Sequence, residues 1–138
     1  MTLVYGDTNS TLAGAIASAK LHIKIGHVEA GLRSFDMDMP EEINRILTDR
    51  ISHVLFCPTN AAVKNLMNEG YASMPCEIVE TGDVMHDALL YYKNEAKQVS
   101  SILKDLNLES KDFVLATVHR PENTDHHGTL QAIIDSFI

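Results

Sequence analysis

Residues 3–28 read LVYGDTNSTLAGAIASAKLHIKIGHV, and this stretch predicts a strand, a helix and a second strand in succession. The apolar run at residues 3–5 stops at a polar turn, which is typical of a short buried strand. Residues 9–21 are rich in alanine, with larger apolar residues at helical spacing, and Asn9 or Ser10 is suited to cap that helix. The last six residues of the stretch form a second apolar run. A strand, a helix and a strand in this order predict a parallel pair joined by a crossover helix.

The rest of the chain continues the alternation of strands and helices. Such alternation favours an α/β fold, with Rossmann-like parallel sheets and flanking helices. The helix that begins at Pro40 is expected to bury one apolar stripe, formed by Ile43, Ile46, Leu47 and Ile51. Further strands are predicted at residues 54–56, 77–79 and 113–118, and further helices at residues 59–67, at 84–106 with a break near Ser100 or Ser101, and from about Gly128 onward.

Composition limits the classes of function. The 138 residues are 45% hydrophobic and 22% charged, which is ordinary for a globular protein. A formal charge of −8 does not favour non-specific binding of nucleic acid, which depends on Lys and Arg. Cys57 and Cys76 lie outside any metal-binding spacing and are expected to be free thiols. The sequence has no signal peptide and no apolar run of membrane-spanning length, so we expect a cytoplasmic protein without membrane contact.

Polar residues follow several of the predicted strands. Asp7 follows the first strand, Glu29 follows the second, and His119 with Arg120 follows the strand at residues 113–118. Ligands of open α/β sheets bind outside the carboxyl ends of the strands, so these residues are candidates for one site. His119 could equally be a strand-end histidine with a structural hydrogen bond. Glu41 begins a helix and could face the same crevice.

The acidic candidates also have structural alternatives. Asp7 could cap the helix that follows it. Glu29 should be largely buried after its strand, and a buried ion pair with Arg33 would account for it. Glu41 and Glu42 could simply complement the positive end of the helix dipole. Taken one at a time, these residues leave both interpretations open.

Several longer motifs occur along the chain in a fixed order. They are GDTNSTLAGA at residues 6–15, HVEAGLR at 27–33, MPEEINR at 39–45, LTDR at 47–50, TGDV at 81–84 and HRPEN at 119–123. Together they resemble the non-hydrolysing UDP-N-acetylglucosamine 2-epimerase family. The resemblance covers nearly the whole chain and is far more specific than any single motif.

The resemblance implies a fold and a domain organisation. Members of this family have two Rossmann-like domains that face each other across a cleft, as in GT-B glycosyltransferases. The chain would then be a fragment of such a protein. Residues 1–82 would form the C-terminal part of the first domain. Residues 83–138 would form an interdomain helix and the start of a truncated second domain.

The resemblance also implies an activity. The family interconverts UDP-GlcNAc and UDP-ManNAc by eliminating UDP to give a 2-acetamidoglucal and adding UDP back on the other face. Its pattern assigns proton transfer to Asp7, Glu29 and Glu41. It implies that His119, Arg120 and Arg45 bind or orient the substrate. The route needs no metal and no redox cofactor, and the full-length protein is expected to be a homodimer.

Other interpretations remain open at the level of sequence. The loop at residues 34–39 is shorter than the aromatic-containing segment of many relatives, which affects the details of substrate binding. The hydrolysing epimerases carry a different motif at the position of residues 27–33, which favours the non-hydrolysing type and leaves a hydrolysing epimerase as the alternative. The chain alone could also be a catalytically incomplete fragment that binds nucleotide sugar. A GT-B glycosyltransferase would share the fold but would need an acceptor site.

Overall fold

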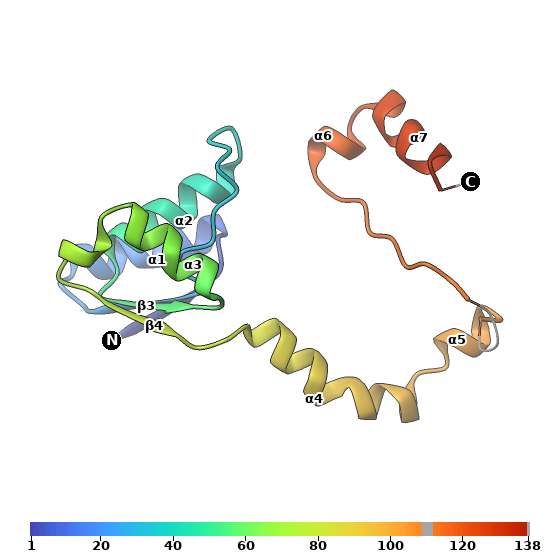
Figure 1. Cartoon of the computed structure of the whole chain (residues 1–138), viewed down its shortest axis with the longest axis horizontal. Coiled ribbons are helices and arrows are strands. Elements are labelled where there is room, and N and C mark those ends of the chain that lie inside the picture. Colours follow the sequence, from blue (N-terminus) through green and yellow to red (C-terminus); the bar gives the residue numbers. More distant parts are fainter. Residues whose placement is uncertain (109–111, 138) are drawn as a thin grey trace. The chain divides into compact units, whose positions relative to one another are not determined.

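The computed structural model describes residues 1–108 and 112–137 (Figure 1). The chain contains two compact units, Met1–Asn94 and Glu95–Ile138. The helix α4 (Val84–Val99) runs across the junction between them. The domain boundary predicted after residue 82 stays a prediction.

The first unit is built on a four-stranded parallel sheet in the order β1-β2-β3-β4. Its strands are β1 (Thr2–Tyr5), β2 (Ile25–Val28), β3 (Val54–Cys57) and β4 (Glu77–Glu80). This arrangement confirms the predicted α/β class and all four strands predicted in this part of the chain. Each strand has four residues, and the strands are mainly apolar at their centres, as expected for a parallel sheet with a covered face. The register aligns one row across the sheet, Val4, His27, Leu55 and Ile78.

Three helices lie on one face of this sheet (Figure 1). They are α1 (Asn9–Lys20), α2 (Pro40–Ile51) and α3 (Asn60–Asn68). Thr8 caps α1, since its hydroxyl accepts a hydrogen bond from the amide of Thr11 at 3.3 Å, so the prediction of Asn9 or Ser10 as the cap was wrong. Thr59 caps α3 in the predicted way.

The helix α2 does not bury the apolar stripe that its sequence predicts. Ile43 and Leu47 are 39% and 45% exposed. The helix instead buries a polar set on its inner side, Glu42, Asn44, Thr48 and Asp49. The prediction failed because Glu42, Asn44 and Asp49 have hydrogen-bonding partners in the loops at the carboxyl end of the sheet, which the helical spacing does not reveal.

The remaining elements are helical. A short 3-10 helix, η1 (Tyr71–Ser73), precedes β4. The break predicted near Ser100 is confirmed, because α4 ends there and α5 (Ile102–Asp105) follows. The second unit also contains α6 (Pro121–Thr124), where a loop was predicted, and α7 (His127–Asp135). Among the described residues, no helix is long and apolar enough to cross a membrane.

The strand predicted at residues 113–118 is absent from the structure. The side chains of Phe113, Val114 and Leu115 are 51%, 88% and 84% exposed. A β-strand exists only when its backbone groups pair with a neighbouring strand. The described sheet consists of β1 to β4, and none of these strands pairs with this segment. High β propensity alone therefore does not produce a strand here.

Candidate functional site

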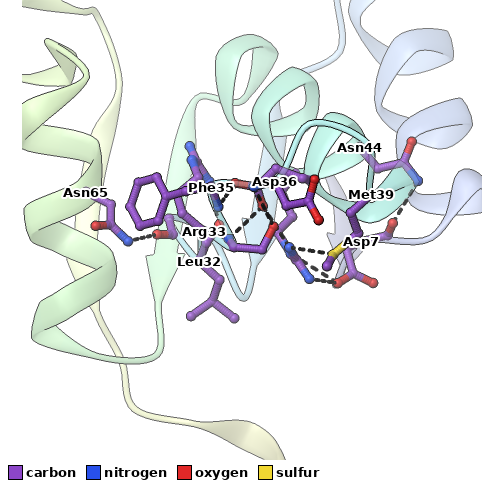
Figure 2. Close-up of polar contacts among 12 residues, drawn as sticks. Asp7, Leu32, Arg33, Phe35, Asp36, Met39, Asn44 and Asn65 are labelled. Atoms are coloured by element: carbon purple, nitrogen blue, oxygen red, sulfur yellow. Dashed lines mark hydrogen bonds and ion pairs between the residues drawn. The ribbon is translucent and has the colours of Figure 1, made fainter. Parts of the chain in front are cut away.

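The carboxylate of Asp7 lies just beyond β1 and forms an ion pair with Arg45 on α2 (Figure 2). The Asp7 Oδ2 atom accepts hydrogen bonds from Arg45 Nη2 at 2.6 Å and from Nε at 3.1 Å. The Asp7 side chain is 31% exposed, so it is held firmly but remains accessible. Both bonds go to the same oxygen, so the guanidinium orients the Asp7 carboxylate. Thr8, and not Asp7, caps the helix that follows, while the role predicted for Arg45 toward substrate stays a prediction.

Glu42 connects this ion pair to the loop at residues 34–39. Its Oε2 atom accepts from Arg45 Nη1 at 2.8 Å, and the two carboxylate oxygens accept from the amides of Ser34 and Phe35 at 3.0 and 2.9 Å. Burial by itself would raise the pKa of Glu42, but the two amides and Arg45 outweigh it and hold the pKa below its usual value. Glu42 is thus an ionised anchor for the loop, a role that the sequence interpretation missed.

Asn44 makes a second connection between α2 and the turn after β1. Its Nδ2 atom donates to the carbonyl of Asp7 at 2.8 Å and to Asn9 Oδ1 at 3.0 Å (Figure 2). The backbone and the side chain of Asp7 are therefore both held by neighbouring positions on the same helix. This double attachment fixes the direction in which the carboxylate points.

Glu29 lies beside Asp7, in the turn that follows β2. It is half-buried and adopts a left-handed backbone with φ of 73°, which is uncommon for a residue other than glycine. A Cβ placed on Gly6 would lie 3.7 Å from Glu29 Oε2, so the Glu29 carboxylate reaches the residue immediately before Asp7. Two of the three predicted acidic residues therefore lie in neighbouring turns at the carboxyl edge of adjacent strands.

The alternative of a buried ion pair between Glu29 and Arg33 is not what the structure shows. Arg33 donates from Nη1 to Asp49 Oδ2 at 2.8 Å and forms a two-point pair with Glu69 at 2.7 and 2.8 Å. Burial would lower the pKa of Arg33, but the bonds to Glu69 and Asp49 raise it on balance, so the guanidinium stays charged. Arg33 therefore does not account for Glu29.

His27 and Asp49 form a fully buried pair that the sequence interpretation missed. Their side chains are 0% exposed, and His27 Nδ1 lies 2.6 Å from Asp49 Oδ1. His27 stands in the inward-facing row of β2, where strand alternation requires an apolar residue or a fully bonded polar one. That alternation was the available signal. Nothing in the local spacing points to Asp49 as its partner.

The other predicted site residues lie apart from this cluster or in the second unit. Glu41 is exposed at the start of α2. His119 and Arg120 are exposed and belong to the second unit. The carbonyl of Arg120 accepts hydrogen bonds from the amides of Asn123 and Thr124. His119 and Arg120 therefore lie immediately before α6. Their roles stay predictions.

The fold and the acidic cluster together define an α/β protein whose candidate site lies at the carboxyl edge of a parallel sheet, as is usual for ligand sites in this class. Residues 1–137 match the family model described as UDP-N-acetylglucosamine 2-epimerase. The chain belongs to this family.

Several characterised relatives are similar to the chain. A UDP-N-acetylglucosamine 2-epimerase homolog of Methanococcus maripaludis is 58% identical, over 100% of this chain and 38% of the relative. A UDP-2,3-diacetamido-2,3-dideoxy-D-glucuronate 2-epimerase of Pseudomonas aeruginosa is 55% identical, over 97% of this chain and 36% of the relative. A UDP-N-acetylglucosamine 2-epimerase of M. maripaludis is 46% identical, over 97% of this chain and 37% of the relative.

A solved structure confirms the fold. The crystal structure of Methanocaldococcus jannaschii UDP-GlcNAc 2-epimerase in complex with UDP-GlcNAc and UDP matches 98% of this chain and 37% of that protein. The TM-score is 0.84 at 44% sequence identity. The chain therefore spans well under half the length of the relatives that it matches.

Proposed function

We propose that the protein is a UDP-N-acetylglucosamine 2-epimerase that interconverts UDP-GlcNAc and UDP-ManNAc. The observation that carries the proposal is the placement of Asp7 and Glu29 in neighbouring turns at the carboxyl ends of β1 and β2, with Glu29 Oε2 3.7 Å from the position of a Cβ on Gly6. Epimerisation at C2 needs proton donors and acceptors close together, and carboxylates supply them. The family and the bound UDP-GlcNAc of the M. jannaschii relative support this substrate class.

The proposed route is an elimination followed by an addition. A carboxylate removes the C2 proton, the bond between C1 and the UDP oxygen breaks, and a C1–C2 double bond forms in a 2-acetamidoglucal. The reverse steps return a proton to the opposite face of C2 and rejoin UDP at C1. We assign these proton transfers to Asp7, Glu29 and Glu41. Two carboxylates near one another favour different protonation states, which suits paired acid and base roles.

The remaining groups would bind and orient. Arg45 orients Asp7 through its two-point contact. We assign His119 and Arg120 to the diphosphate, because positive groups stabilise the charge of a departing UDP. The proposal uses no metal and no redox cofactor.

The test uses a protein of full family length that carries this chain. Incubated with UDP-GlcNAc in heavy water, it should produce UDP-ManNAc with deuterium at C2, read by proton NMR. Absence of both the product and the exchange would overturn the proposal. Free ManNAc together with UDP would indicate a hydrolysing epimerase. Turnover by the 138-residue chain alone would exclude the alternative of a catalytically incomplete fragment.

Variants sharpen this test. Glu29→Gln and Asp7→Asn should each lower kcat by about 10²- to 10⁴-fold, as expected for loss of a general acid or base. Glu77→Gln, on the exposed first position of β4, is the matched control and should leave kcat unchanged. Equal activity in all three variants would remove the two carboxylates from the mechanism.

A second substrate is favoured by one comparison. The P. aeruginosa 2-epimerase of UDP-2,3-diacetamido-2,3-dideoxy-D-glucuronate is more similar to the chain than the M. maripaludis UDP-GlcNAc 2-epimerase is. The same C2 chemistry applies to both sugars, which differ at C3 and C6. Measuring kcat/KM for each sugar nucleotide in competition identifies the physiological class, and a ratio above about tenfold decides between them.

A further inference from the structure

His27 bridges two acceptor groups on opposite sides of its ring. Its Nε2 atom lies 2.8 Å from the carbonyl oxygen of Gly6, and its Nδ1 atom lies 2.6 Å from Asp49 Oδ1. Gly6 is the residue immediately before Asp7 and has a positive φ of 64°. Its amide is also fixed, since it donates to the Val28 carbonyl at 3.0 Å. His27 therefore holds the backbone from which the Asp7 side chain projects.

Asp49 holds the second acidic turn. Its Oδ2 atom accepts from the amide of Gly31 at 3.1 Å and from Arg33 Nη1 at 2.8 Å. The amide of Ala30 is bound to the Phe56 carbonyl at 3.1 Å. The amides of Ala30 and Gly31, which follow the left-handed Glu29, are thus both hydrogen-bonded. Such contacts hold a strained backbone conformation in place at a functional site.

The hydrogen bonds determine where the proton of this pair resides. A carbonyl oxygen only accepts, so Nε2 of His27 must donate to Gly6, and a neutral imidazole has no second proton for Nδ1. Either His27 is an imidazolium or Asp49 is protonated. The amide of Gly31 and the guanidinium of Arg33 both favour the ionised form of Asp49. The proton therefore belongs to His27.

The surrounding charges agree with this assignment. The cations His27 and Arg33 balance the anions Asp49 and Glu69 in one connected network. Tyr71, which lies near Asp49, is kept neutral because burial and the charge of Asp49 raise its pKa to about 12. Buried charges are stable only when they are paired and hydrogen-bonded, and each member of this network is both.

We propose that His27 and Asp49 are a paired positioning unit for the two carboxylates, with His27 held as a doubly protonated imidazolium. This inference rests on the proposed epimerase function. The pair fixes Gly6 on one side and Gly31 on the other, so it sets the distance between the Asp7 and Glu29 carboxylates. Neither His27 nor Asp49 is exposed to touch the substrate. Their effect acts on the geometry of proton transfer and not on the binding of UDP.

The charge state is read by NMR on the full-length protein with nitrogen-15-labelled histidine. At neutral pH His27 should show a proton on both ring nitrogens. His53 is the internal control, because its Nδ1 accepts a hydrogen bond from the amide of Ile25 and so carries no proton. In Asp49→Asn, the new amide can donate to Nδ1, and His27 should then keep only the Nε2 proton. A single ring proton on His27 in the parent protein overturns the assignment.

The positioning role is read by kinetics. His27→Gln cannot bridge both acceptors and should lower kcat by about 10- to 100-fold with KM changed less than about threefold, since small misplacements of catalytic groups have effects of this size. Asp49→Asn should keep kcat near the parent value, because it keeps every hydrogen bond. If His27→Gln fails to fold, Asp49→Ala, which removes the acceptor shared by His27 and Gly31, takes its place. His53→Gln, at an exposed position, should leave both constants unchanged.

The outcomes separate this inference from the function on which it rests. A folded His27→Gln or Asp49→Ala variant with the parent kcat overturns the positioning role while leaving the epimerase intact. A parent protein without C2 exchange on either sugar nucleotide overturns the proposed function, and the positioning role falls with it. The NMR result for His27 stands independently in both cases.

Discussion

The two halves of the helix-covered face of the sheet have opposite chemistry. Where α3 covers β3 and β4, the core is apolar and consists of Ala30, Leu55, Cys57, Ala62, Leu66 and Tyr71. Where α2 covers β2, the core also contains a buried polar and charged set that includes His27, Glu42, Thr48 and Asp49, next to a small apolar cluster of Val4, Ala15 and Ile25. The same backbone architecture therefore supports a packed core on one side and an ionic network on the other.

The difference indicates a division of roles. Apolar burial stabilises the fold in proportion to the area removed from water and does not depend on direction. A buried ionic network contributes little net stability compared with apolar residues of the same volume, but it fixes directions and is costly to break at one member. The polar half lies beneath Asp7 and Glu29, which is where fixed directions are needed.

The largest effect is expected from breaking the polar half at its centre. Asp49→Ala leaves His27, Arg33 and the amide of Gly31 without their shared acceptor and should lower the free energy of unfolding by about 3–5 kcal/mol. Urea unfolding measures the change. Asp87→Ala, on the exposed first turn of α4, is the control and should stay within about 0.5 kcal/mol of the parent. A loss below about 1 kcal/mol for Asp49→Ala would show that the network is loosely held.

The apolar half should respond to a cavity. Leu66 is fully buried in α3, and Leu66→Ala should cost about 2–4 kcal/mol through lost burial and the void left behind. Leu21→Ala is the matched control because that side chain is 70% exposed. If Leu66→Ala cost more than Asp49→Ala, the apolar half would dominate stability and the contrast between the halves would be reversed.

Gly31 lies where the polar half meets the apolar half, which we call the seam, so a substitution there affects both halves. Its amide binds Asp49 and its carbonyl accepts from Asn65 on α3 at 3.0 Å (Figure 2). A Cβ at this position would lie 2.5 Å from the Ala62 carbonyl oxygen, and φ is 77°. Gly31→Ala should therefore cost about 2–3 kcal/mol from strain and steric overlap together.

Gly70 supplies the comparison for Gly31. It has a similar φ of 85°, but a Cβ there meets nothing within 4 Å. Gly70→Ala should cost only about 1 kcal/mol, from the backbone conformation alone. Equal costs in the two variants, measured by urea unfolding, would mean that the α3 backbone moves away and that the seam is not rigid.

The sequence predicts the apolar half better than the polar half for a physical reason. The strands β1 to β4 and the helix α3 were predicted because short apolar runs and caps are local signals. The ionic contacts join residues far apart in the chain: His27 and Asp49 are 22 positions apart, Arg33 and Glu69 are 36 apart, and Asp7 and Arg45 are 38 apart. Such pairs depend on how elements pack, which spacing does not encode.

The candidate site, too, was predicted only as far as local sequence patterns determine where residues lie. Asp7 and Glu29 were predicted to lie at one edge of the sheet because each follows a strand. The alternation of strands and helices indicates a parallel sheet, in which all strands end at the same edge. The apolar stripe predicted for α2 failed since polar partners in the neighbouring turns outweighed the helical pattern. The segment at residues 113–118 failed because a strand needs a partner that the described sheet does not supply.

A smaller effect than those of Asp49, Leu66 and Gly31 is expected at the edge of the polar half, where Glu42 joins Arg45 to the loop at residues 34–39. Because its pKa is lowered in the folded state, its stabilisation is complete above the unfolded value near 4.5 and is lost as pH falls through the folded value. Glu42→Gln should cost about 1–2 kcal/mol at neutral pH. Its unfolding free energy should also fall less steeply than that of the parent below pH 4.5.

Glu41→Gln is the matched control for this pH dependence, since Glu41 is the exposed neighbour of Glu42 on the same helix turn. Urea unfolding at several pH values should give Glu41→Gln the acid slope of the parent and Glu42→Gln a shallower one. An unchanged slope in Glu42→Gln would mean that the amides of Ser34 and Phe35 do not hold the carboxylate in solution. The loop would then be attached to the ion pair of Asp7 and Arg45 by packing alone. The network of polar contacts would include α2 but would not extend into the loop at residues 34–39.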